Sequence, residues 1–145
     1  MTTIESQSSQ QNHNAAVQAF SYIESGQVND AIALFADHAE FRNPLLPTLK
    51  GKKNIGRMLS LVFGKLVSKA EFKNMRVCIS DNVAMIERKE VLHFGRRINV
   101  GMPVVATITI ENGKIVEWRD YYDWLTLLAV TAKTGITLPF ALFKK

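Results

Sequence analysis

Four consecutive stretches in the second half of this 145-residue chain alternate between apolar and polar side chains with a period of two. Such alternation is typical of β-strands, in which successive side chains point to opposite faces of a sheet. The strongest turn signal between the stretches is Asn112-Gly113, because it supplies the positive φ angles of a type I′ hairpin turn. We therefore predict four hairpin-linked strands, over residues 72–79, 83–93, 98–110 and 114–124.

The first half of the chain has the three- and four-residue spacing of amphipathic helices instead. Ala16, Val17, Phe20 and Ile23 form one such stripe, and Gly26 ends the helix that it predicts. Further elements are a short helix capped by Asn29 or Asp30, an extended piece over 39–43, a helix over 51–68 and a last helix over 125–134.

Helices first and then a run of hairpin-connected strands form an α+β pattern. We expect a curved, mostly antiparallel sheet wrapped around the N-terminal helices, with a cone-shaped pocket between them. Residues 14–145 are predicted to form this single domain. Residues 1–13 are polar and offer little to bury, which predicts a disordered lead-in.

The composition argues against several classes of function. The net charge is +5, but the lysines are scattered and no aromatic-interleaved basic motif appears, so we expect no nucleic-acid partner. No apolar stretch approaches the roughly 18 residues of a membrane span, and the polar N-terminus lacks the apolar core of a signal peptide. The single cysteine, Cys78, favours the reducing cytoplasm. His13, His38 and His93 lack metal-ligand spacing, so we expect no metal site.

Ionisable residues interrupt the apolar faces of two predicted strands. Arg88 and Glu90 share one face, and Asp120 shares another with Trp118 and Tyr122. A buried charge costs several kcal/mol unless it is paired, and Arg88 is placed by alternation to pair with both acids. Coupled acids can divide into an ionised base and a protonated acid. The alternative is a structural Asp–Arg pair that ties two strands together, with Glu90 in solvent at a strand end.

Asn43 lies on the short extended piece, on the same face as Phe41 and just before Pro44. An Asn side chain both donates and accepts hydrogen bonds, so Asn43 could orient a water molecule beside a base. Asn before Pro is equally typical of a turn start. The following loop, 45–49, is unusually apolar and is expected to line a cavity or a partner surface.

These residues resemble a known family. Glu87-Arg88-Lys89-Glu90-Val91-Leu92 is similar to the E-R-x-D-V-L strand of the limonene-1,2-epoxide hydrolase family. The segment from Asn112 to Asp123 resembles its G-K-I…W-R-D-Y-F-D ending, and Phe41-Arg42-Asn43 occupies the place of its Y-x-N segment. The resemblance covers roughly residues 15–128 and implies a cystatin-like cone (the NTF2-like fold), shared with ketosteroid isomerases and SnoaL-like polyketide cyclases.

The resemblance also implies a reaction: attack of water on a small lipophilic epoxide in one step, without metal or cofactor. It assigns the general base to Asp120, the acid to Glu90, the arginine between them to Arg88 and the water-holding residue to Asn43. Glu90 replaces the family's aspartate, and Phe41 replaces its water-holding tyrosine. The resemblance also implies a homodimer. The expected substrate-binding residues are Phe41, Leu45, Leu92, Met102, Val104, Trp118 and Tyr122.

Two other functions fit the same cone. An isomerase or cyclase would act on a steroid or polyketide, but ketosteroid isomerases need a carboxylate near the first strand, where this chain has Asn43. A non-catalytic dimer that binds an apolar ligand is favoured by Phe41, which has no hydroxyl.

Overall fold

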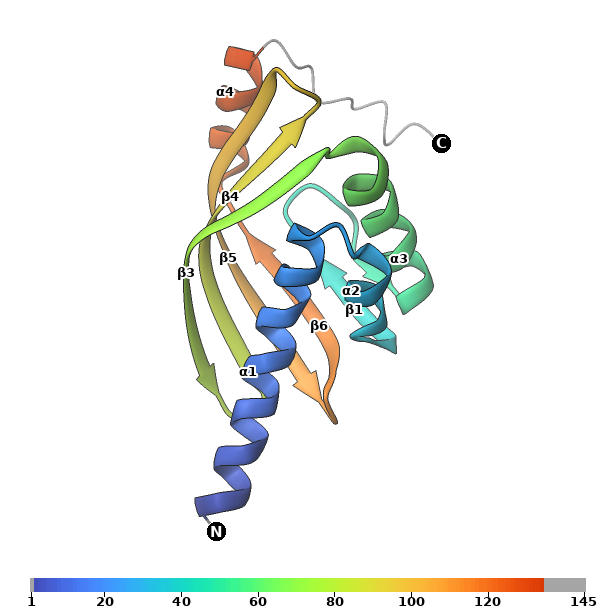
Figure 1. Cartoon of the computed structure of the whole chain (residues 1–145), viewed down its shortest axis with the longest axis vertical. Helices are drawn as coiled ribbons and strands as arrows, with labels where there is room; N and C mark the ends of the chain where they lie inside the picture. Colours follow the sequence, from blue (N-terminus) through green and yellow to red (C-terminus); the bar gives the residue numbers. More distant parts are fainter. Residues whose placement is uncertain (1, 135–145) are drawn as a thin grey trace.

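The protein is described by a computed structural model over residues 2–134. Its centre is a six-stranded, strongly twisted sheet that is not closed into a barrel (Figure 1), with the strand order β2-β1-β6-β5-β4-β3. Strands β3 to β6 pair antiparallel in sequence, whereas β1 is parallel to β6. The strands are β1 (Phe35–Arg42), β2 (Leu49–Lys50), β3 (Lys69–Ser80), β4 (Val83–Phe94), β5 (Ile98–Glu111) and β6 (Lys114–Tyr121).

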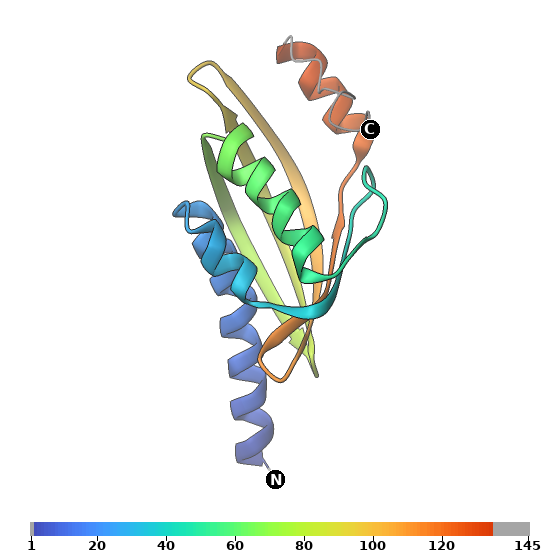
Figure 2. The ribbon, with the colours of Figure 1, turned by 90° about the vertical axis from the view of Figure 1, so that its right-hand side faces the viewer.

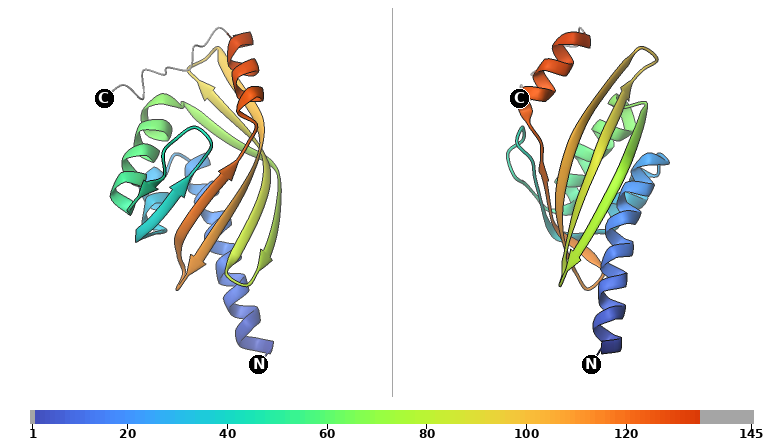
Figure 3. Two further views of the ribbon diagram at one scale, coloured as in Figure 1. Left: turned by 180° about the vertical axis from the view of Figure 1, so that it is seen from behind. Right: turned by 90° about the vertical axis from the view of Figure 1, so that its left-hand side faces the viewer.

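Three helices lie against one face of this sheet, and Figure 2 shows α2 and α3 on the same side as α1, with α4 beyond the end of β6. Seen from behind, the opposite face of the sheet carries none of these three helices (Figure 3). The architecture confirms the predicted α+β fold. The helices are α1 (Thr2–Glu24), α2 (Val28–Ala33), α3 (Lys52–Leu61), the π-helical turn η1 (Val62–Leu66) and α4 (Trp124–Thr134).

The core lies between α1 and the inner face of the sheet. Along β4 every second residue is buried, and the run of buried positions passes from Ala84 and Ile86 to the charged Arg88 and Glu90. The buried side of α1 is made of three alanines together with Phe20 and Ile23, and the alanines let the helix approach the sheet closely. The alternation that predicted the strands therefore also places two charged side chains inside.

Several boundaries differ from the sequence-based prediction. Strand β1 begins at Phe35 rather than at residue 39, because Phe35 pairs with Ile115 of β6. Strand β6 ends at Tyr121 rather than at 124, because Asp123 caps α4 by accepting hydrogen bonds from the Leu125 amide (2.9 Å) and the Thr126 hydroxyl (2.8 Å).

Helix α1 begins at Thr2, within the segment 1–13 for which the sequence predicts a disordered lead-in. Helix propagation adds one backbone hydrogen bond per residue and needs no apolar contact of its own. The side chain of Asn12 also donates to the Asp81 carbonyl at 3.4 Å, in the turn between β3 and β4. The division of the chain at residue 14 stays a prediction, and the last part of the predicted domain, residues 135–145, lies outside the described residues.

No helix within residues 2–134 has the length and apolar character needed to cross a bilayer.

Candidate active site

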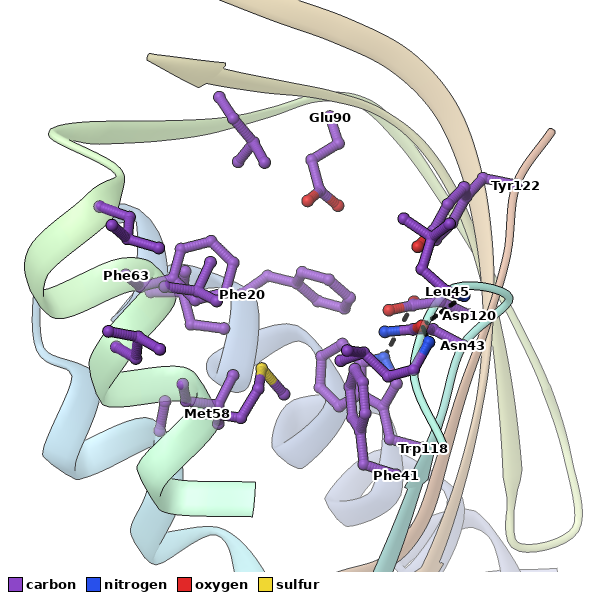
Figure 4. Close-up of a pocket in the computed structure, with 18 of the residues that line it drawn as sticks. Phe20, Phe41, Asn43, Leu45, Met58, Phe63, Glu90, Trp118, Asp120 and Tyr122 are labelled. Carbon is purple, nitrogen blue, oxygen red and sulfur yellow. Dashed lines mark hydrogen bonds between the residues drawn. The ribbon is translucent and has the colours of Figure 1, made fainter. Parts of the chain in front are cut away.

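A cavity of about 630 Å³ lies between the inner face of the sheet and the helices α1, α3 and η1 (Figure 4). Its volume falls within the ordinary range of small-molecule sites. Most of its wall is aliphatic or aromatic. The side chains with polar atoms in the described lining are Asn43, Arg57, Arg88, Glu90, Trp118, Asp120 and Tyr122. Arg88 and Glu90 come from β4, and Trp118 and Asp120 come from β6.

The sheet register brings the β4 and β6 groups together across β5. Asp120 pairs with Ala106, and Arg88 pairs with Val104, two residues along the same strand. Ala106 is fully buried and has the smallest side chain that an L-residue can have. A large residue at this position would fill the space through which Arg88 and Asp120 reach one another.

Arg88 bridges the two acids through one nitrogen. Its Nη2 donates to Glu90 Oε2 at 2.7 Å and to Asp120 Oδ1 at 3.3 Å. The side chains of Arg88, Glu90 and Asp120 are only 2%, 11% and 13% exposed. The indole nitrogen of Trp118 also donates to Asp120 Oδ1, at 2.9 Å. The structure therefore joins the three residues that the sequence singled out in one buried unit.

Two phenylalanine rings enclose the guanidinium of Arg88. Its Cζ lies 4.6 Å from the ring centroid of Phe20 and 5.6 Å from that of Phe72, distances at which a cation is attracted to an aromatic face. The Nε and Nη1 atoms of Arg88 are buried without a hydrogen-bond partner among the described residues. The rings on α1 and β3 thus hold the cation in place and keep bulk water from it.

Burial changes the protonation of both acids. Loss of hydration raises the pKa of Asp120, while Arg88 and the Trp118 hydrogen bond oppose that shift. Loss of hydration also raises the pKa of Glu90; Arg88 opposes the shift, and the charge of Asp120 adds to it. One arginine neutralises one carboxylate, so the unit is electrically neutral when a single proton is shared between the acids. Because the charge of Asp120 raises the pKa of Glu90, an ionised Asp120 favours a protonated Glu90.

Asn43 starts a turn and also lines the cavity. Its Oδ1 accepts hydrogen bonds from the backbone amides of Leu45 and Leu46, at 2.9 and 2.8 Å, and so starts the turn of the apolar loop. The same side chain lines the cavity beside Asp120 (Figure 4). Its Nδ2 has no hydrogen bond to any side chain or backbone group in residues 2–134 that would occupy it. The Nδ2 of Asn43 can therefore donate a hydrogen bond into the cavity, whereas its Oδ1 is already occupied as an acceptor.

The other predicted pocket residues lie in the wall with one exception. The lining includes Phe41, Leu45, Leu92, Met102, Trp118 and Tyr122. Val104 differs, because it is buried in a cluster with Val100, Met102 and Leu127 and is not in the cavity lining.

Some wall residues escaped the sequence analysis. Phe20 was assigned to the helix stripe, but nothing local to the sequence indicated that it would face Arg88. Leu127 of α4 closes one side of the cavity, and Arg57 of α3 is exposed at its edge. Phe63 lies four residues after Leu59, a helical spacing that indicates the inward side of α3, whereas Arg57 lies only two residues before Leu59 and no such spacing indicates it.

Within residues 2–134 no three His, Cys, Asp or Glu side chains lie close enough together to hold a metal ion. The sequence-based expectation of a metal-free site stays a prediction.

Solved structures share this fold at low sequence identity. An LEH-like epoxide hydrolase of M. tuberculosis is 19% identical, with a TM-score of 0.76 over 90% of this chain and 96% of that chain. A SnoaL-like polyketide cyclase of Shewanella putrefaciens, so named provisionally, is 16% identical, with a TM-score of 0.74 over 85% and 86%. An NTF2-like protein of unknown function from Burkholderia pseudomallei is 12% identical, with a TM-score of 0.73 over 83% and 96%.

At these identities the structural likeness shows the fold alone. None of the curated proteins matches the chain. The model of the limonene-1,2-epoxide hydrolase catalytic domain matches residues 11–133, which include every strand and the whole cavity wall described above. The chain therefore belongs to the limonene-1,2-epoxide hydrolase family.

Proposed function

We propose that the protein is an epoxide hydrolase that adds water to a lipophilic epoxide in one step and releases a diol. The observation that carries this proposal is the single guanidinium nitrogen of Arg88 shared by Glu90 and Asp120, at 2.7 and 3.3 Å, in an apolar cavity. Family membership supports the same reaction. The mostly aliphatic and aromatic wall suits a substrate without charge.

In the proposed step Asp120 takes a proton from a water molecule as the water oxygen attacks one epoxide carbon. The bond between that carbon and the epoxide oxygen breaks, and Glu90 gives its proton to the departing oxygen. The product is a neutral diol, and the step leaves Asp120 protonated and Glu90 ionised. Return of the proton from Asp120 to Glu90 restores the resting state, and Arg88 neutralises whichever carboxylate is ionised throughout the cycle.

Substitution of the base tests the proposal. Asp120→Asn keeps the shape of the side chain but removes its ability to take a proton, so diol formation from a panel of lipophilic epoxides should fall by at least about a hundredfold. The matched control is Asp123→Asn, outside the cavity, because Asn caps a helix as well as Asp does. Circular dichroism would establish that both variants fold. Full activity in the folded Asp120→Asn variant would refute the proposal.

A non-catalytic binding protein is the second candidate, favoured by the absence of a hydroxyl on the cavity residue Phe41. It predicts tight binding of apolar ligands and no turnover across the same epoxide panel. Proton transfer of the ketosteroid isomerase kind is less well supported, because the cavity-lining side chain just after the first strand is the neutral Asn43. Migration of a double bond in a model enone would revive that reaction.

A homodimer in the cytoplasm is part of the same proposal. The outer face of the sheet carries Met85 at 52% and Tyr121 at 48% exposure, and a second copy would bury these side chains. Light scattering after size-exclusion chromatography would give the mass in solution. The exposed free thiol of Cys78 suits a reducing compartment, and cell fractionation tests that placement.

A further inference from the structure

Tyr122 lies directly after the end of β6, two residues beyond Asp120, and both side chains line the cavity. Its side chain is half-buried and lines the cavity, and Figure 4 shows it on the same side as Asp120 and Asn43. Of the described residues that line the cavity, Tyr122 alone carries a hydroxyl group. Phe41, which lines the cavity from β1, has no hydroxyl group.

The hydroxyl of Tyr122 lies within the electrostatic reach of both acids. Burial raises the pKa of Tyr122, and the charges of Asp120 and Glu90 raise it further. The phenol therefore stays protonated over the whole pH range in which the acids titrate. A neutral hydroxyl can both accept and donate a hydrogen bond.

An attacking water needs all of its hydrogen-bonding directions fixed except one. Asp120 accepts one hydrogen of this water, and the free Nδ2 of Asn43 can donate to one lone pair. The second lone pair must point at the epoxide carbon, which leaves the second hydrogen without an acceptor. The Oδ1 of Asn43 cannot serve, because the amides of Leu45 and Leu46 occupy it.

We infer that Tyr122 is a catalytic residue whose hydroxyl oxygen accepts the second hydrogen of the attacking water. This inference rests on the proposed function, because it concerns the water of that reaction. The four directions of the water are then Asp120, Tyr122, Asn43 and the epoxide carbon. A water held in this way attacks from one orientation, and a small misplacement of a reacting atom is costly in rate.

The test compares Tyr122→Phe, Phe41→Tyr and the double variant with the wild type, with the full chain and an epoxide that the wild type hydrolyses. Tyr122→Phe retains the ring and its packing, so we expect kcat to fall about five- to tenfold while KM changes by less than about twofold. Phe41 lies beside Trp118, with ring centroids 6.3 Å apart, on the same wall as the base. The hydroxyl that Phe41→Tyr introduces in the double variant should recover at least about half of the lost rate.

The outcomes test the role of Tyr122 separately from the proposed hydrolysis of the epoxide. Wild-type turnover together with an unchanged kcat in Tyr122→Phe would overturn the role of Tyr122 and leave the proposed function standing. A higher KM with an unchanged kcat would also overturn it, since it would mark Tyr122 as part of the wall only. Absence of turnover by the wild type would overturn both. Equal thermal midpoints of wild type and Tyr122→Phe exclude misfolding as the cause of a lower kcat.

Discussion

Removal of the charge of Arg88 is the sharpest physical perturbation of this site. Arg88→Met keeps an unbranched side chain against the rings of Phe20 and Phe72 but leaves Glu90 and Asp120 without a cation. Arg88 is 3% exposed, so no solvent replaces the guanidinium. The acids share one proton in our account, and the substitution therefore leaves one buried carboxylate uncompensated rather than two.

The expected cost follows from that single charge. Breaking a buried ion pair by removing one partner costs about 3–5 kcal/mol, so the free energy of unfolding at pH 7 should fall by about this amount. The cost should shrink as the pH falls toward 4, because the acids lose their charge without the arginine and a neutral carboxyl is cheaper to bury.

Equilibrium unfolding in urea at pH 7 and pH 4 measures both effects. The control is the triple variant Arg88→Met, Glu90→Gln, Asp120→Asn, in which no charge remains in the unit and the side chains keep nearly their original size. It should recover most of the stability lost at pH 7, since a buried charged triad can be replaced by neutral residues at little cost. A loss below about 1 kcal/mol in Arg88→Met, or a triple variant as unstable as the single one, would show that the three charges are not coupled.

Three further predictions concern pH and shape. The pH profile of kcat should be bell-shaped, because the rate rises as Asp120 ionises and falls as Glu90 ionises. Both limbs should lie above the ordinary pKa values of 3.8 for Asp and 4.5 for Glu, because burial raises the pKa of both acids. A flat profile between pH 4 and 9 would contradict this prediction. Because its pKa is raised in the folded protein, Glu90 contributes stability below about pH 4.5 that is lost as the pH rises through the raised pKa. Glu90→Gln should therefore unfold at a higher temperature than the wild type at pH 8 and show no such gain at pH 4, in thermal scans of both proteins. Leu92→Trp should fill part of the cavity and lower kcat/KM for a long epoxide at least about tenfold more than for a short one, whereas equal losses would place Leu92 away from the substrate.

The strands and the charged face could be predicted because both depend on local patterns. The period of two and the Asn112-Gly113 turn predicted β3 to β6 to within a few residues of their observed ends. The same period put Arg88 and Glu90 on the inner face of β4, where the structure has them. Alternation along β6 put Asp120 on the same inner face, whereas its position beside Arg88 also depends on the register across β5.

Features that depend on contacts distant in sequence could not be predicted in this way. The parallel pairing of β1 with β6 decides where β1 begins, and no residue near Phe35 encodes it. The register shift in β3 between Lys73 and Arg76 places Asn74 at a φ of 55°, and alternation alone gives no sign of it. The stacking of Phe20 on Arg88 depends on how α1 docks, and the engagement of Asn43 Oδ1 depends on the path of its loop.

The oxygen source in the first turnover tests the central claim most directly. Excess enzyme is mixed with an epoxide in water enriched in oxygen-18, and the diol from a single turnover is analysed by mass spectrometry. If Asp120 acts only as a base, one labelled oxygen from the solvent appears in the diol from the first turnover onward. An unlabelled first-turnover diol, with the label appearing only in later turnovers, would mean that a carboxylate oxygen of the protein attacks the substrate, and would contradict the one-step addition of water.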